Sequence, residues 1–197
     1  MEDFKHHIHN LLQKLGVDIY FLYKLRPSMK EVEGRNLIGV EIGTYRGHNA
    51  KRIIKNMDIK RLYLIDPYTS YEEEDMWVNR MCPLDKAERY ARKKLKRYKN
   101  LIFIKKKSED AVKDIPDNLD FVYIDGNHSY KKVKKDIELY YPKLKEGCIM
   151  GGHDFESHET EGVKNAVIDF ITKNNLQLFV RRPDWWIKKG EKRRKIK

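Results

Sequence analysis

Acidic and histidine side chains follow two apolar runs in the second half of the chain. Asp125 and His128 stand in IDGNHSY, and His153 and Asp154 stand in MGGHDF. If the two runs are neighbouring strands about 4.8 Å apart, the carboxylates of Asp125 and Asp154 converge on one cation. Oxygen ligands favour Mg²⁺ or another hard divalent ion, and His153 or His128 as a further ligand would admit Mn²⁺ or Fe²⁺. The alternative is that each aspartate caps the helix that follows it.

A histidine at such a site could also take the proton of a substrate hydroxyl. The unperturbed imidazole pKa of about 6.5 suits base chemistry around neutral pH. His153 and His128 are the candidates, and we prefer His153. Each could equally be a hydrogen-bonded structural residue.

A cofactor turn is predicted in the stretch LIGVEIGTYRG, which spans residues 37–47. The apolar run, the acidic Glu41 and the glycines at 43 and 47 read as strand, tight turn and helix, with Thr44 and Tyr45 inside the turn. A dinucleotide-binding turn has a second glycine two residues after the first, but this chain has Tyr45 there, which disfavours a dinucleotide. No P-loop sequence follows. Glu41 would repel phosphate but attract an ammonium group, as S-adenosylmethionine carries. A turn that only connects strand to helix is the alternative.

Further candidate cofactor residues follow the next two apolar runs. Asp66 ends the second run, 23 residues after Gly43, where a carboxylate can accept hydrogen bonds from both ribose hydroxyls. Ser108 and Asp110 follow the third run, on the expected adenine side. The long connection after Asp66 is aromatic and acidic, which is typical of a lid or substrate contact, although a solvated surface loop fits it as well.

Strand-length apolar runs that alternate with helical patterns must position these residues. We expect strands at 36–43, 61–66, 101–106, 119–125 and 147–151, which predicts an α/β fold with a doubly wound, mostly parallel sheet. The tail LQLFVRR, Pro183-Asp184 and WWIKKG predicts an antiparallel hairpin, and core packing is expected for both Trp185 and Trp186. Residues 1–35 are expected to form helices that cover the sheet or pair two copies as a homodimer, and 191–197 a basic tail.

Composition limits the function classes. A chain of 197 residues suits one domain, here 36–190, and two cysteines do not make a disulfide framework. A net charge of +12 predicts attraction to polyanions, and the predicted helix at 85–100 is crowded with Lys and Arg. No apolar run reaches the length of a membrane span and no secretory signal order is present, so a cytoplasmic location is expected.

The ordered motifs VEIGTYRG, LYLIDPY, FVYIDGNHSYKKVKKDIELYYPKLKEGCIMGGHDF and GVKNAVIDF resemble those of the class I S-adenosylmethionine-dependent methyltransferases. They are most similar to the branch of macrocin-type sugar O-methyltransferases and cephalosporin hydroxylase-like proteins. The resemblance covers residues 36–190. It implies a Rossmann-like, seven-stranded sheet whose last hairpin strand is antiparallel.

Site residues carry over from the resemblance position by position. They are the cofactor turn at Glu41, Gly43 and Gly47, the ribose carboxylate Asp66, the adenine side at Ser108 and Asp110, and the metal carboxylates Asp125 and Asp154, with Asp125 also beside the cofactor. Two positions depart from the family pattern, because Asn127 and His153 stand where those enzymes tend to have aspartates. A neutral amide cannot act as a base, so the proton acceptor must lie elsewhere.

The expected activity is transfer of the S-adenosylmethionine methyl group to a hydroxyl of a sugar, glycoconjugate or other small molecule. An RNA substrate held by the basic surface is one alternative. A non-catalytic binding or assembly module of the same fold is another, because a fold does not fix a function.

Overall fold

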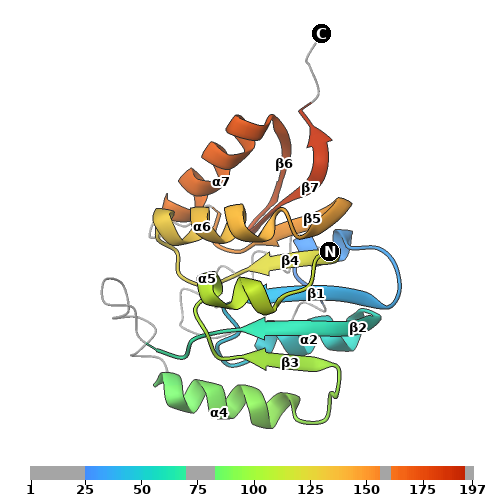
Figure 1. Cartoon of the computed structure of the whole chain (residues 1–197), viewed down its shortest axis with the longest axis vertical. Helices are drawn as coiled ribbons and strands as arrows, with labels where there is room; N and C mark the ends of the chain where they lie inside the picture. The colour runs from blue at the N-terminus through green and yellow to red at the C-terminus, as the bar shows by residue number, and fades with distance from the viewer. Residues whose placement is uncertain (1–24, 70–82, 156–160, 194–197) are drawn as a thin grey trace, which may run out of the picture.

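The computed structural model describes residues 25–69, 83–155 and 161–193 and shows helices packed around one seven-stranded sheet (Figure 1). The strands are β1 Leu37–Ile42, β2 Ile59–Ile65, β3 Leu101–Ile104, β4 Leu119–Ile124, β5 Leu144–Gly152, β6 Leu176–Arg181 and β7 Asp184–Lys192. The α-helices are α2 His48–Asn56, α4 Leu84–Leu95, α5 Ser108–Ala111, α6 Tyr130–Tyr140 and α7 Glu161–Asn174, and the short 3-10 helices are η2 Ser28–Glu31 and η3 Val112–Asp114.

The strand order is β3-β2-β1-β4-β5-β7-β6. Strands β1 to β5 pair in parallel, whereas β7 runs antiparallel to both β5 and β6. The chain moves outward from β1 to β3 and then returns to place β4 beside β1. In open α/β sheets ligands bind at the carboxyl ends of the strands where the order reverses, so the ends of β1 and β4 mark the expected ligand crevice.

The predicted α/β sheet, its five parallel strands and the terminal antiparallel hairpin are confirmed. Strand β5 begins at Leu144, earlier than the predicted 147. The three residues after Leu144 are exposed and show no apolar pattern, so the sequence does not mark them as part of a strand. Both tryptophans are buried as expected, with Trp186 stacked on Phe179 at a ring-centroid separation of 5.7 Å.

Alternate side chains of each central strand bury on opposite faces of the sheet. In β4, Phe121 and Tyr123 join a cluster with residues of η2, α2 and α4, whereas Val122 and Ile124 join a cluster with residues of α6 and α7. This period of two is what a strand buried on both sides produces. The sheet is thus packed on both faces, and the loops at its carboxyl edge extend from buried strands.

The segment before β1 packs against the sheet as part of this fold. Helix η2 lies against β5 and β7, and Met29 is fully buried in the core. The rest of the expected N-terminal helices, and any dimer they would form, lie outside the described residues, as do residues 70–82 of the expected lid and 194–197 of the basic tail. In the described part of the chain, no helix combines the length and apolar character needed to cross a bilayer.

Candidate functional site

Glu41 is buried at the end of β1 with only 1% of its surface exposed. Its Oε1 accepts a hydrogen bond from the Asn49 side chain on α2 at 2.9 Å, while its Oε2 has no hydrogen-bond partner in the part of the chain that the structure describes. Burial raises the pKa of Glu41 to about 8, with Asp125 and Asp66 adding to the effect and Asn49 opposing it. A carboxylate held in this way is poised to receive a cationic group.

Gly43 allows the turn after β1 to pack directly on the turn after β4. Its φ is +88°, and a Cβ at this position would lie 2.0 Å from the carbonyl oxygen of Asp125. The Asp125 amide also donates to the Ile42 carbonyl at 2.8 Å. At Gly43 the backbones of the two turns thus come into direct contact, which brings Asp125 next to the cofactor turn.

The rest of the turn is compact. Thr44 is buried, and its carbonyl accepts a hydrogen bond from the Gly47 amide at 2.8 Å. Gly47 takes a left-handed conformation, with φ +67°, directly before helix α2. Tyr45 also has a positive φ, of 44°. The turn therefore leads from β1 into α2 within five residues, as the motif predicted.

Asp66 ties the cofactor turn to the loop after β2. Its Oδ2 accepts a hydrogen bond from the Tyr45 amide at 2.7 Å, and its Oδ1 accepts one from the Tyr68 amide at 2.8 Å. Burial raises the pKa of Asp66, against the effect of these two hydrogen bonds. Each carboxylate oxygen can accept a second hydrogen bond, so Asp66 retains the capacity to bind two ribose hydroxyls.

Ser108 and Asp110, the expected adenine-side residues, begin helix α5. The Ser108 hydroxyl donates to buried Asp136 on α6, and the Ser108 carbonyl accepts from the Tyr140 hydroxyl at 2.8 Å. Burial raises the pKa of Asp136 to about 7. The Asp110 amide donates to the Lys107 carbonyl within the first turn of the helix. The hydroxyl of Ser108 is therefore occupied in joining α5 to α6.

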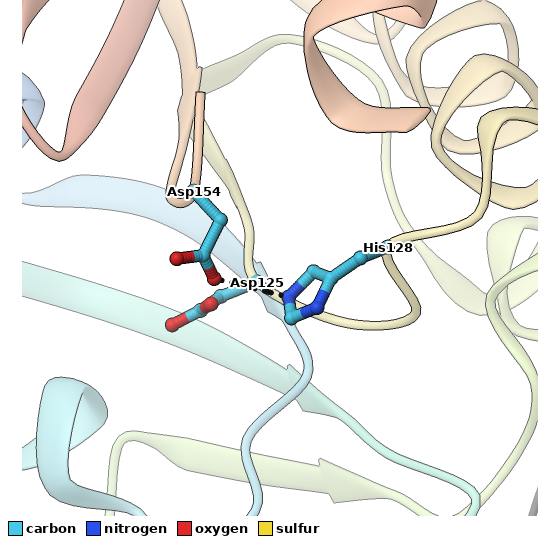
Figure 2. Close-up of side chains that lie close together, drawn as sticks. All are labelled: Asp125, His128 and Asp154. Atoms are coloured by element: carbon cyan, nitrogen blue, oxygen red, sulfur yellow. Dashed lines mark ion pairs between the residues drawn. The ribbon is translucent and has the colours of Figure 1, made fainter. Parts of the chain in front are cut away.

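An acidic and imidazole cluster lies where β4 and β5 end (Figure 2). Asp125 and His128 follow β4, Asp154 follows β5, and one ligand atom from each lies within 4.8 Å of the others. The His128 Nε2 is 3.2 Å from Asp154 Oδ2. Asp154 has a φ of 59°, which is uncommon for a residue other than glycine.

His153 occupies a different position from His128. Its Nδ1 lies 2.9 Å from Asp154 Oδ2 and 3.9 Å from Asp125 Oδ1, while Arg26 Nη1 lies 2.8 Å from its Nε2. Only 9% of His153 is exposed, whereas the His128 side chain is 38% exposed. Both ring nitrogens of His153 are thus engaged, whereas His128 belongs to the group of three residues that could hold a metal ion.

Asn127, which stands where the family tends to have an aspartate, makes a local turn. Its side-chain oxygen accepts a hydrogen bond from the Ser129 amide at 2.8 Å, directly before helix α6. An asparagine often makes such a turn before a helix. This role requires no charge on residue 127.

Sequence reasoning missed three residues that reach this site from the two ends of the chain. Arg26 contacts His153, while Ser28 donates to Asp184 Oδ2 from its hydroxyl at 2.6 Å and from its amide at 3.2 Å. Asp184 is fully buried at the start of β7, and burial raises its pKa. In the sequence, Arg26 and Asp184 stand beside prolines and resemble ordinary turn residues, so no local pattern indicates their partners.

A family model described as a methyltransferase domain matches residues 40–155, from β1 to the residue after Asp154. The chain belongs to this methyltransferase domain family. The match spans the cofactor turn, Asp66 and the cluster of Asp125, His128 and Asp154, and it confirms the resemblance that the ordered motifs indicated. Arg26, Ser28 and Asp184 lie outside the matched segment.

Known proteins resemble the chain at different levels. Uncharacterized protein R132 of Acanthamoeba polyphaga mimivirus is 28% identical over 133 residues, which are 64% of this chain and 55% of that protein, so the chain spans about half the length of this relative. The structure of the O-methyltransferase NovP is similar with a TM-score of 0.63 at 19% identity, covering 89% of this chain and 81% of NovP. The structure of SMU.1697c from Streptococcus mutans, a methyltransferase-like protein in complex with SAH, is similar with a TM-score of 0.61 at 15% identity. The similarity covers 82% of this chain and 93% of SMU.1697c. These structural likenesses establish the fold.

Proposed function

We propose that this protein transfers the methyl group of S-adenosylmethionine to a hydroxyl oxygen of a small-molecule acceptor, with a sugar or glycoconjugate as the favoured class. The observation that carries the proposal is the pair of acids at the ends of β1 and β2 inside a methyltransferase domain, the buried Glu41 and the partly buried Asp66. The acceptor class follows from the resemblance of the motifs to sugar O-methyltransferases.

The residues of the β1 and β2 ends fit the cofactor. Glu41 Oε2 is a buried acceptor without a hydrogen-bond partner among the described residues, which suits an ammonium group. Asp66 has acceptor capacity left for two ribose hydroxyls. Glu41 gives an ammonium group a hydrogen-bond acceptor but offers a phosphate group no positive charge, so S-adenosylmethionine fits better than a dinucleotide.

The cluster beyond β4 and β5 fits a divalent cation held by Asp125 and Asp154. Two carboxylates, with water completing the shell, suit Mg²⁺ or Mn²⁺. A bound cation would orient an acceptor hydroxyl and make it more acidic.

His128 is the better-placed proton acceptor of the two histidines. It is more exposed than His153, and its Nε2 lies 3.2 Å from the Asp154 carboxylate, a contact that can orient the ring and leave Nδ1 to take a proton. His153, with both nitrogens engaged, serves better to hold Asp154 in place. The remaining work of the protein is to align the acceptor oxygen with the methyl group and to exclude water.

Calorimetric titration with S-adenosylhomocysteine, with and without Mg²⁺, tests the cofactor. Micromolar binding, about −8 kcal/mol, is expected. The variants Asp125→Asn and Asp154→Asn should keep this affinity and lose transfer of a labelled methyl group to a panel of glycosides. His128→Asn should lose transfer but retain Mn²⁺ binding. Absence of cofactor binding in every condition would contradict the proposal and favour a binding module of this fold.

RNA is a second candidate acceptor, favoured by one specific observation. The segment from Leu84 to Lys107, which is α4 and the edge strand β3 with their flanks, carries eleven Lys and Arg residues against two acids, so most of the net charge of +12 is concentrated there. If RNA is the substrate, its affinity should fall steeply as salt is raised. Tight binding that salt does not weaken would exclude this candidate.

A further inference from the structure

A short segment that precedes the matched domain reaches into the proposed transfer site. Residues 26–31 lie on the carboxyl end of β5, where a Cβ on Gly151 would meet the Ser28 Cβ at 2.8 Å. Ser28 is fully buried and anchored to Asp184 of β7. Strand residue 151 must therefore be glycine to admit this segment, which shows that the segment is part of the folded domain.

Arg26 is placed by this anchored segment with only 5% of its surface exposed. Its guanidinium donates to His153 Nε2 at 2.8 Å. An arginine side chain has no acceptor and stays charged, so the Nε2 that it contacts must carry no proton. The ring proton of His153 then lies on Nδ1, which faces Asp154 Oδ2 at 2.9 Å.

The contacts form one chain of hydrogen bonds, from Arg26 to His153 to Asp154. Asp154 sits at a φ of 59°, a conformation that costs free energy for a residue with a Cβ and that its surroundings must hold. The hydrogen bond from His153 fixes the Oδ2 side of this carboxylate, beside Asp125 and His128. Partners that hydrogen-bond to metal ligands in this way tune the affinity of a site for its ion.

We propose that Arg26 is a positioning residue of the transfer site, which fixes His153 as its Nδ1–H tautomer and thereby holds the Asp154 carboxylate at the cation site. The role of the cation site rests on the proposed function, whereas the tautomer of His153 does not. The domain would then need the segment before β1 to complete its site.

The experiment uses the full chain with ¹⁵N-labelled histidine and long-range ¹H–¹⁵N correlation spectra near pH 7.5. His153 is assigned from a His153→Gln spectrum. The expected wild-type result is a neutral His153 with its proton on Nδ1. A proton on Nε2 in the wild-type protein would overturn the proposal without any further variant.

Three variants separate a specific role of the Arg26 side chain from a general effect of changing this segment. Arg26→Met should lose the Nδ1–H tautomer and bind Mn²⁺ about tenfold or more weakly, with S-adenosylhomocysteine affinity unchanged. Arg26→Lys, which keeps a charged donor, should restore the tautomer. Glu31→Gln, which changes an exposed side chain of the same segment, should leave it unchanged.

The outcomes distinguish this proposal from the proposed function. An unchanged His153 spectrum in Arg26→Met, or an equal change in Glu31→Gln, would overturn the positioning role. If wild-type protein binds neither Mn²⁺ nor S-adenosylhomocysteine, the proposed function fails, and the tautomer still decides the role of Arg26.

Discussion

At the scale of single residues, the raised pKa of Glu41 predicts that cofactor binding releases a proton. Its pKa of about 8 means that the carboxyl is mostly protonated at pH 7 in the free protein. A cationic amine placed beside it lowers this pKa, so binding should release a proton. Titrations with S-adenosylhomocysteine at pH 7 in phosphate and in Tris should therefore give different apparent enthalpies.

The variant Glu41→Gln tests the origin of that proton. It should remove the dependence of the enthalpy on the buffer and weaken binding by about tenfold, the loss expected for a charge-assisted hydrogen bond. Glu31→Gln, which changes an exposed carboxylate on η2, should behave like the wild type. An equal buffer dependence in the Glu41→Gln variant would show that another group releases the proton.

At the scale of elements, the contact between the turns after β1 and β4 depends on Gly43. Gly43→Ala places a Cβ 2.0 Å from the Asp125 carbonyl oxygen and holds an alanine at φ +88°. The free energy of unfolding, measured in urea, should fall by about 2–4 kcal/mol. Gly126→Ala is the matched control, because its Cβ would make only ordinary contact, at 3.5 Å from Ile42. Equal losses in the two variants would contradict this account of the turn.

The strands and the cofactor turn were predictable from the sequence because their signals are local. Apolar runs bounded by Gly, Pro and polar residues predicted the sheet, and neighbouring parallel strands bring Asp125 and Asp154 together by geometry alone. The different surroundings of His128 and His153 were not predictable. They depend on the backbone conformation around Asp154 and on Arg26, which is 127 residues away from its partner in the sequence.

Long-range polar contacts set the limit of sequence reasoning at this site. Asp184 lies at the predicted hairpin connection beside Pro183, yet it is a buried acceptor for Ser28. Ser108 matched a cofactor position, yet its hydroxyl bonds to Asp136. Neither pairing has a periodic pattern in the sequence, because the partners lie on elements that meet only in the folded chain.

At the scale of the whole molecule, buried acids should make stability fall as the pH rises. The pKa of Asp136 rises from 3.8 to about 7 on folding, and that of Glu41 rises from 4.5 to about 8. Between the unfolded and the folded pKa values, these two acids hold protons in the folded chain that they have released in the unfolded chain. Their contribution to the free energy of unfolding is therefore complete below about pH 4 and is lost as the pH rises through the folded pKa values.

Unfolding in urea at pH 5.5 and pH 8.5 measures this loss. Asp136→Asn should reduce the difference in unfolding free energy between the two pH values by about 2 kcal/mol, because about 1.5 pH units separate pH 5.5 from the folded pKa. Glu138→Gln, an exposed position on the same helix, is the control for the change in charge and should leave the difference as in the wild type. An unaltered difference in Asp136→Asn would show that this acid is ionised in the folded protein.

The charge of the whole molecule is concentrated at one end. Helix α4 and the edge strand β3 lie at the end of the sheet opposite α7 and β6 (Figure 1), and the segment from Leu84 to Lys107 holds most of the positive charge. Opposing acids pair with part of it, as Glu88 does with Arg92 and Lys105. The exposed lysines that remain on this face should bind polyanions through released counterions.

A triple variant of this end, Lys93→Gln, Lys96→Gln and Lys99→Gln, should weaken binding of a single-stranded RNA and reduce the slope of log K against log salt by about two. The matched variant Lys131→Gln, Lys135→Gln and Lys164→Gln removes the same charge from exposed positions of α6 and α7 and should leave both quantities near the wild-type values. Both variants should bind S-adenosylhomocysteine as the wild type does. An equal loss of RNA affinity in the two triple variants would show that net charge, rather than the α4 end, attracts the polyanion.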